Sequence, residues 1–160
     1  MFVLGIDPGL TRTGYGLVEA GSPPIAHFAG AIVTETALTA AERLYELKQG
    51  LDGVLTRHLP DSVAIERTFT NRNLQTAISV GRASGVALAT AAEHGVPVFE
   101  YAPTAVKLAI TGDGNAGKRA VQSMVARLLG LAVAPRPADA SDALAIALCH
   151  LRSARMGLKR

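Results

Sequence analysis

Short apolar runs at the start of the chain alternate with turn residues and predict a group of strands. Runs at 2–7, 13–20 and 25–34 are separated by Pro8-Gly9 and by the glycine- and proline-rich stretch 21–24, which are typical turn sequences. Connections this short join antiparallel neighbours, so we predict that the three strands form a meander.

Helical spacing follows the meander. Thr39 and Glu42 have the spacing of a capping box, and apolar residues then recur every three or four positions as far as His58. Pro60 ends this predicted helix. We expect His58 to close the helix face and not to bind a metal.

The rest of the chain alternates between the two patterns. Its predicted elements are a strand at 62–66, a helix at 71–93, a strand at 97–101, a helix at 103–110, a helix carrying Val121 to Leu129, and a last helix opened by Asp139 and Asp142. This order predicts an α/β fold in which helices flank a five-stranded mixed sheet. We expect one domain at 1–155 and a basic, disordered tail at 156–160.

Composition agrees with a single domain and argues against several classes of protein. Of the 160 residues, 49% are hydrophobic, and no run of about 18 apolar residues predicts a membrane span. No basic region precedes the first apolar run, so we expect no secretory signal and a cytoplasmic protein. The single cysteine, Cys149, fits a reducing compartment. Because it lies in an apolar helical run, a packed thiol is expected there and not a nucleophile.

The charge is modestly basic, with a net charge of +3 and a pI of about 9.4. By itself this is a weak indicator of nucleic-acid binding. One group of cations lies in or beside predicted loops: Arg67, Arg72, Lys107, Lys118 and Arg119. A second group crowds the C-terminus, where a solvated surface is the simpler interpretation. The loop group is more informative because it flanks acidic residues.

Four of those acidic residues stand at the ends of apolar segments. Asp7 ends the first predicted strand, Glu66 ends the fourth, and Asp139 and Asp142 open the last helix. Carboxylates from different core elements can converge in one cleft and bind Mg²⁺ or Mn²⁺. Two such ions about 3.5–4 Å apart can hydrolyse a phosphodiester, with a lysine neutralising the phosphoryl charge. In a basic chain, the pattern predicts a metal-dependent enzyme that acts on a polyanion.

Each acid also has an ordinary structural role. Asp7 before Pro-Gly suits an Asx turn, and Asp139 and Asp142 suit the N-cap and first turn of a helix. Glu66 fits a surface role less well, because its strand is predicted to be buried. The last helix is apolar almost all round, which is typical of a buried helix. Its two acids are spaced i, i+3 and are expected to face one cleft, so together the four favour metal binding.

A phosphate-binding P-loop is a competing interpretation of one segment. Residues 112–118 match the motif as far as Lys118. The motif then needs Ser or Thr to hold Mg²⁺, and the chain has Arg119. The preceding segment also predicts a helix where a strand is required. We therefore interpret the segment as a glycine-rich loop that carries Lys118 towards a nucleic acid.

Sequence motifs add a resemblance to a known family. Residues 4–9 and 13–16, LGIDPG and TGYG, resemble the opening of ribonuclease H-like nucleases and equally that of actin-like ATPases and sugar kinases. The segments 64–69, AIERTF, and 138–145, ADASDALA, distinguish these possibilities. In this order and at this length, the motifs resemble the RuvC family of Holliday-junction resolvases over essentially the whole chain.

The resemblance implies a ribonuclease H-like fold and a structure-selective endodeoxyribonuclease. Such an enzyme resolves four-way (Holliday) DNA junctions by paired, symmetric, metal-dependent nicks during homologous recombination and DNA repair. The family's metal ligands fall on Asp7, Glu66, Asp139 and Asp142, with two Mg²⁺ (or Mn²⁺) ions expected. Some members carry histidine at or beside position 139, where this chain has an acid.

The resemblance also assigns residues to DNA. Lys107 and Lys118 correspond to the basic residues beside the scissile phosphate, and Phe69 to an aromatic residue that contacts bases near the junction centre. An exposed aromatic side chain among cations suits base stacking. We expect Arg67, Arg72 and Arg119 to bind DNA as well. Other members can have an uncharged residue at the position of Arg67, so its role stays open.

The partners that the resemblance implies are junction DNA, a second copy of the chain and a branch-migration motor of the RuvA and RuvB type, with no membrane. The helix at 71–93 is our candidate for the homodimer contact, because Gly81, Ser84 and Gly85 let another backbone approach. The alternative is a helix that packs only on its own sheet. A two-fold dimer would match a pseudo-two-fold junction.

Three other functions compete with this one. The other bacterial ribonuclease H-like resolvase type starts similarly, but the segment Glu66 to Phe69 and the spacing of Asp139 and Asp142 speak against it. An actin-like ATP-binding protein needs two related domains, and 160 residues hold one. A junction-binding protein without catalysis would not need all four acids.

Overall fold

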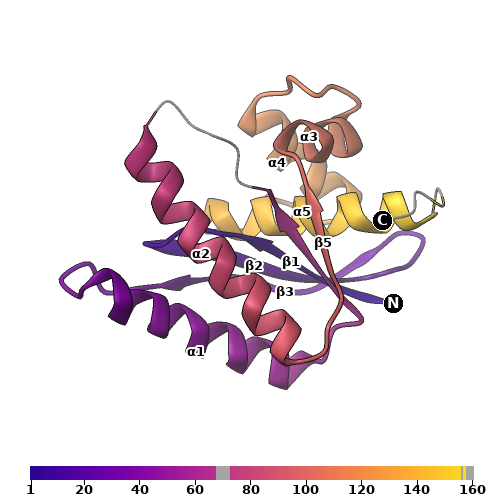
Figure 1. The fold of residues 1–160 in the computed structure, drawn as a ribbon. Coiled ribbons are helices and arrows are strands. Elements are labelled where there is room, and N and C mark those ends of the chain that lie inside the picture. The colour runs from indigo at the N-terminus through magenta and orange to yellow at the C-terminus, as the bar shows by residue number, and fades with distance from the viewer. Residues whose placement is uncertain (68–72, 156, 158–160) are drawn as a thin grey trace.

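The computed structural model describes residues 1–67, 73–155 and 157 (Figure 1). Its strands are β1 (Phe2–Asp7), β2 (Arg12–Glu19), β3 (Ile25–Val33), β4 (Ser62–Glu66) and β5 (Val98–Tyr101). Its helices are α1 (Ala40–His58), α2 (Leu74–Glu93), α3 (Pro103–Thr111), α4 (Lys118–Leu128) and α5 (Ala138–Arg155). The predicted order of elements and the single α/β domain are confirmed.

The five strands form one mixed sheet in the order β3-β2-β1-β4-β5. The pairs β1–β2 and β2–β3 are antiparallel, as the meander predicts, whereas β4 runs parallel to both β1 and β5. Ile6 lies opposite Ile65 in the β1–β4 ladder. The next residues, Asp7 and Glu66, are the last of their strands and therefore lie at the same end of the sheet.

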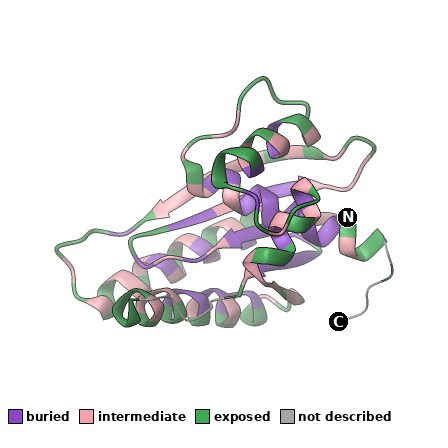
Figure 2. Cartoon of the chain, turned by 90° about the horizontal axis from the view of Figure 1, so that it is seen from above, coloured by how far each residue is buried: buried purple, intermediate pink, exposed green. Residues whose placement is uncertain are grey.

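Helices cover both faces of the sheet. Helices α1 and α2 lie on one face, while α5 crosses the other and carries α3 and α4 on its outer side (Figure 1). Each face has its own apolar core, since Leu4 and Ile6 pack with α1 and α2 whereas Val3 packs with α5. Figure 2 shows the buried residues gathered between these layers.

Two glycines allow α5 to lie directly on the sheet backbone. A Cβ atom added at Gly5 would stand 1.9 Å from the carbonyl oxygen of Ala143, and one added at Gly14 would stand 2.1 Å from that of Asp139. No side chain fits between these backbones. From Ala140 to Leu151, every residue of α5 except Asp142 is buried, as its apolar sequence predicts.

Two predicted helix starts are wrong. Helix α2 begins at Leu74, because Asn73 is extended and its side chain accepts hydrogen bonds from the first-turn backbone N–H groups. Helix α5 begins at Ala138, so Asp139 is a first-turn residue and not an N-cap. The capping box of α1 is confirmed, since the Thr39 backbone N–H donates to Glu42 and the Glu42 N–H donates to the Thr39 hydroxyl.

The cysteine and the helices bear on two further expectations. Cys149 is buried, and burial raises the pKa of its thiol to about 11, which keeps it protonated and unreactive. This agrees with a packed thiol. Among the described helices, none combines the length and the hydrophobicity that a membrane span requires.

Candidate active site

The acidic residues of three elements converge at one edge of the sheet. Asp7 is the last residue of β1, Glu66 is the last of β4, and Asp139 and Asp142 lie in the first turns of α5. Because Gly5 and Gly14 bring α5 onto β1 and β2, both helix acids stand above the end of β1.

The pKa of the Asp7 carboxyl group reflects this convergence. The pKa of its carboxyl rises from 3.8 to about 7, first because the group is buried and then because of the negative charges of Glu66, Asp142 and Asp139. Burial and the charge of Asp142 likewise raise the pKa of Glu66. A mutual effect of this kind requires the four carboxyl groups to be close neighbours.

Two lysines face the acids across a cleft of about 330 Å³ between α3, α4 and α5. Glu66, Lys107, Lys118 and Asp142 line it. The Nζ atom of Lys118 donates to Oδ2 of Asp142 at 2.7 Å, and this hydrogen bond is the main reason that the pKa of the lysine is raised. Lys107 opposes the rise in the pKa of Glu66. The structure thus brings together the four predicted acids and both predicted lysines.

Arg12 is a third cation at the site, and sequence reasoning missed it. Its Nε atom lies 3.7 Å from Oδ2 of Asp139. Register brings it there, because Gly14 pairs with Asp7 and Arg12 therefore opens β2 beside the acidic edge. The sequence did contain a signal for Arg12. The predicted turn after Asp7 leads into an antiparallel strand, and the first residues of that strand must lie near the Asp7 carboxylate.

The donor set fits hard divalent cations, although it is not arranged around one. All four donors are carboxylates. The pKa values of Asp7 and Glu66 are raised first by burial and then by neighbouring negative charge, and a cation would offset that charge. Within the described ranges, no three acidic, histidine or cysteine side chains form a ready ligand group. Lys118 holds Asp142 instead. A cation that binds Oδ2 of Asp142 would replace the ammonium group of Lys118 there.

The ordinary role proposed for Asp7 is wrong. The turn after β1 is closed by Thr13, whose hydroxyl accepts from the Gly9 N–H at 3.2 Å and donates to the Gly9 carbonyl at 2.8 Å. Within the described part of the chain, the Asp7 carboxylate makes no hydrogen bond, so it does not form an Asx turn. The carboxylate remains available to a ligand.

Two of the remaining predicted DNA-binding residues belong to the described part of the chain. Arg67 is exposed just after β4, and its backbone N–H donates to Tyr101 at 2.8 Å. Arg119 is exposed on the first turn of α4. Phe69 and Arg72 lie outside the described residues.

The segment that resembles a P-loop follows a helix, as predicted. Gly112 caps the C-terminus of α3 with a positive φ of 83°. Lys118 begins α4 and pairs with a carboxylate. A P-loop would place this segment after a strand, with Lys118 facing a nucleotide.

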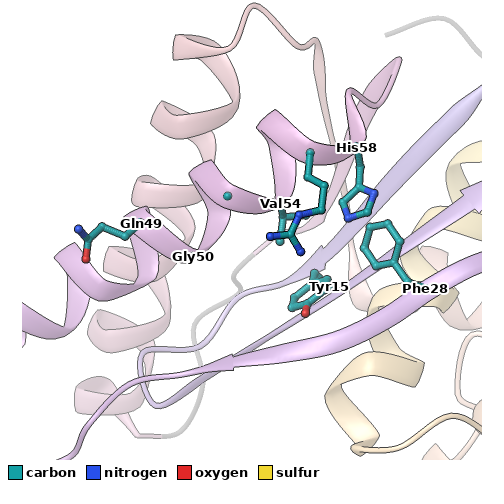
Figure 3. Close-up of a pocket in the computed structure, with 8 residues that line it drawn as sticks. Tyr15, Phe28, Gln49, Gly50, Val54 and His58 are labelled. Carbon is teal, nitrogen blue, oxygen red and sulfur yellow. The ribbon is translucent and has the colours of Figure 1, made fainter.

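A larger hollow of about 430 Å³ lies on the other side of the sheet, between β2, β3 and α1 (Figure 3). Tyr15, Phe28, Arg57 and His58 are among its lining residues, and the rings of Phe28 and His58 are 3.9 Å apart. It contains no carboxylate. His58 ends α1 and stacks on an aromatic ring, which agrees with a packing role.

Known proteins were compared with this chain. Residues 3–150 match the family model described as "Crossover junction endodeoxyribonuclease RuvC". The protein of that name from Frankia casuarinae is 50% identical over 153 residues, which make up 94% of this chain and 89% of that protein. The one from Syntrophomonas wolfei is 50% identical over 158 residues, or 98% and 91%. A solved structure, T. thermophilus RuvC in complex with Holliday junction substrate, has a TM-score of 0.92 and 43% identity and covers 98% of this chain and 96% of that one.

Proposed function

This chain belongs to the RuvC family of crossover junction endodeoxyribonucleases, and we propose that the acidic cluster described above is its nuclease centre. It is a metal-dependent endonuclease that resolves four-way (Holliday) DNA junctions. One observation carries the proposal for the site. The pKa of Asp7 is raised to about 7, first by burial and then by three other carboxylates, which are the hard oxygen ligands that a divalent cation binds.

We propose that two metal ions, either Mg²⁺ or Mn²⁺, bind to Asp7, Glu66, Asp139 and Asp142. When bound, the cations supply an activated water and stabilise the leaving oxygen of the phosphodiester. The chain positions the ligands through its backbone, because α5 rests on β1 and β2 at Gly5 and Gly14. Arg12 holds Asp139 from the side of β2.

Lys118 and Lys107 have a proposed electrostatic role. With Asp142 engaged by metal, the ammonium group of Lys118 loses its partner and is free to contact a non-bridging phosphate oxygen. Lys107 stands beside Glu66 in the same cleft. Two cations at a phosphate that gains negative charge in the transition state lower the barrier.

We infer that Phe69, Arg67, Arg72 and Arg119 contact junction DNA around this centre. Arg67 and Arg119 are exposed and directly follow Glu66 and Lys118, which line the cleft. This supports contacts to the phosphate backbone. Phe69 would stack on a base near the junction centre.

We propose that the enzyme is a homodimer joined through α2. The described residues leave one face of this helix uncovered, because Leu74 is 69% exposed and a Cβ atom added at Gly81 or Gly85 would meet no atom within 4 Å. Ser84 is buried and faces inward, so it does not join the proposed contact. Two centres related by two-fold symmetry would place paired nicks in a pseudo-two-fold junction.

Two further proposals concern the setting of the reaction. A branch-migration motor of the RuvA and RuvB type would present the junction to the dimer. The cytoplasm is the proposed location, and the single buried cysteine, Cys149, is compatible with it.

The test is a synthetic four-way junction with a mobile core. Wild type and Asp7→Asn are compared with and without Mg²⁺ or Mn²⁺, and binding is scored separately from cleavage. We expect metal-dependent paired nicks from wild type and binding without nicks from the variant. Binding without cleavage under either metal would favour an architectural role. If the wild type neither bound nor cleaved the junction, the proposed function would be contradicted.

A further inference from the structure

A second polar hollow of about 440 Å³ lies beside the acidic cluster and separate from the cleft. It is formed by the turn between β1 and β2, the start of α1 and the first turns of α2. Its polar lining residues are Thr11, Arg12, Arg43, Gln75, Thr76 and Ser79. None of its lining residues is acidic, so it favours an anion.

Arg43 is held in this hollow by two neutral hydroxyl groups. Its Nε atom donates to the Thr34 hydroxyl at 3.0 Å, and its Nη2 atom donates to the Thr11 hydroxyl at 2.7 Å. Thr34 is only 2% exposed and donates in turn to the Leu10 carbonyl at 2.6 Å. The guanidinium group is therefore anchored to the turn that follows Asp7.

The anchored guanidinium retains most of its binding capacity. Two of its five N–H groups are used, and three remain. Among the residues described, no carboxylate forms an ion pair with Arg43. A planar cation fixed in orientation, with free donors and no counter-ion, is suited to bidentate contact with a phosphate.

Arg12 links this hollow to the acidic cluster. It lines the hollow and also lies 3.7 Å from Asp139. The side chains of Thr11, Thr76 and Ser79 add hydroxyl donors. A strand that enters the metal site thus meets two arginines and several hydroxyl groups immediately outside it.

We propose that this hollow is a phosphodiester subsite, in which Arg43, with Arg12 beside it, binds a backbone phosphate of the DNA away from the phosphate that is cleaved. The inference rests on the proposed function, since it assigns a further contact to the same substrate. Arg43 acts here as a positioning residue that binds and aligns the strand. It takes no part in the bond cleavage.

The experiment compares Arg43→Gln with Arg57→Gln, which removes the same charge from the exposed end of the same helix. Binding to a junction and to a plain duplex is measured in EDTA over a series of salt concentrations. We expect Arg43→Gln to weaken binding about 3- to 10-fold and to reduce the slope of log K against log salt by about 0.9, the value for one lost phosphate contact. Arg57→Gln should leave the slope unchanged.

A phosphate scan locates the contact. Single neutral methylphosphonates are placed along the strand, and we expect one position to weaken wild type but not Arg43→Gln. If every position weakens the two proteins equally, the subsite is contradicted.

A purely structural role for Arg43 gives a different result. It would lower the melting temperature of Arg43→Gln and weaken binding while the salt slope stayed that of wild type, and this outcome overturns the subsite. Arg43→Lys keeps the charge, so the subsite predicts a slope close to that of wild type. If the wild type did not cleave in the presence of metal, the proposed function would be refuted. The phosphate subsite would not be, because the salt slopes are measured without metal.

Discussion

The ammonium group of Lys118 lies 2.7 Å from Oδ2 of Asp142. Lys118, which we propose to contact the phosphate, is therefore paired with Asp142, which we propose to bind the metal. A divalent cation at Oδ2 of Asp142 and a phosphate at Lys118 would each replace one partner of this pair, which couples metal binding to substrate binding.

Removing Lys118 should therefore affect metal binding and catalysis in opposite directions. We expect Lys118→Met to lower kcat about 10²-fold, because a cation at the phosphate is lost. It should also lower the Mg²⁺ concentration needed for half-maximal cleavage by a few-fold, because Asp142 is no longer held. Single-turnover cleavage over a magnesium titration measures both. Arg127→Met, which removes an exposed positive charge from the last turn of the same helix, is the control. A higher magnesium requirement for Lys118→Met would contradict the exchange.

The raised pKa of Asp7, a half-buried residue, should make the metal-free protein less stable as the pH rises. Its pKa is raised to about 7 in the folded protein, so between about pH 4 and pH 7 the folded state binds more protons than the unfolded state. The free energy of unfolding therefore falls across this window. Asp7→Asn removes the titrating group and should raise the melting temperature in EDTA at pH 8 by at least about 3 °C, since 1 kcal/mol corresponds to roughly 2–4 °C at this size. Melting curves at pH 5 and pH 8 test the sign.

The same carboxylate should be required for cleavage. Asp7→Asn is expected to reduce cleavage about 10³-fold or more and to leave junction binding within a few-fold of wild type, because the substitution removes one negative charge beside the DNA and no cation. A substantial residual rate at saturating metal would remove Asp7 from the ligand set.

The uncovered face of α2 should control the oligomeric state. We expect Ile78→Asp, which places a charge on this face, to weaken the dimer at least about 10-fold, since a charge buried without a partner is costly. Leu59→Asp is the control, an exposed apolar residue at the end of α1. Sedimentation equilibrium measures the dimer. A dimer of unchanged strength in Ile78→Asp would place the contact elsewhere.

The contact between β1 and α5 should tolerate no side chain at Gly5. We expect Gly5→Ala to cost at least about 2 kcal/mol, because its methyl group would overlap the Ala143 carbonyl. Gly53→Ala on α1 is the matched control, since a Cβ atom there meets no atom within 4 Å. That change should be neutral or stabilise by up to about 1 kcal/mol. Urea unfolding of both variants decides between these outcomes.

Much of this architecture was predictable because apolar spacing and turn residues are local signals. The order of elements follows from them, and so does the position of Asp7 and Glu66 at one sheet edge, given parallel strands. The start of α2 was misplaced although Asn73 is a typical N-cap residue, as Thr39 is for α1. Asn71 offers the same capping chemistry two positions earlier, so the local pattern leaves two possible starts.

The cations of the site were harder to predict than its acids. The placement of Arg12 depends on strand register, and the anchoring of Arg43 depends on hydroxyl groups from two distant segments. The pairing of Lys118 with Asp142 needs α4 and α5 to be docked. Each is a tertiary contact, which no spacing within one segment reveals.

The docking of α5 on Gly5 and Gly14 has a consequence for how the nuclease is made. Half of the proposed ligands belong to α5, which follows the other described helices in the chain, and another belongs to β1. A nascent chain that has emerged only as far as α4 carries Asp7 and Glu66 without their partners. The proposed nuclease centre is therefore complete only after α5 has docked on the sheet. An unfinished or misfolded copy of the chain would lack the complete centre and could not cleave chromosomal DNA.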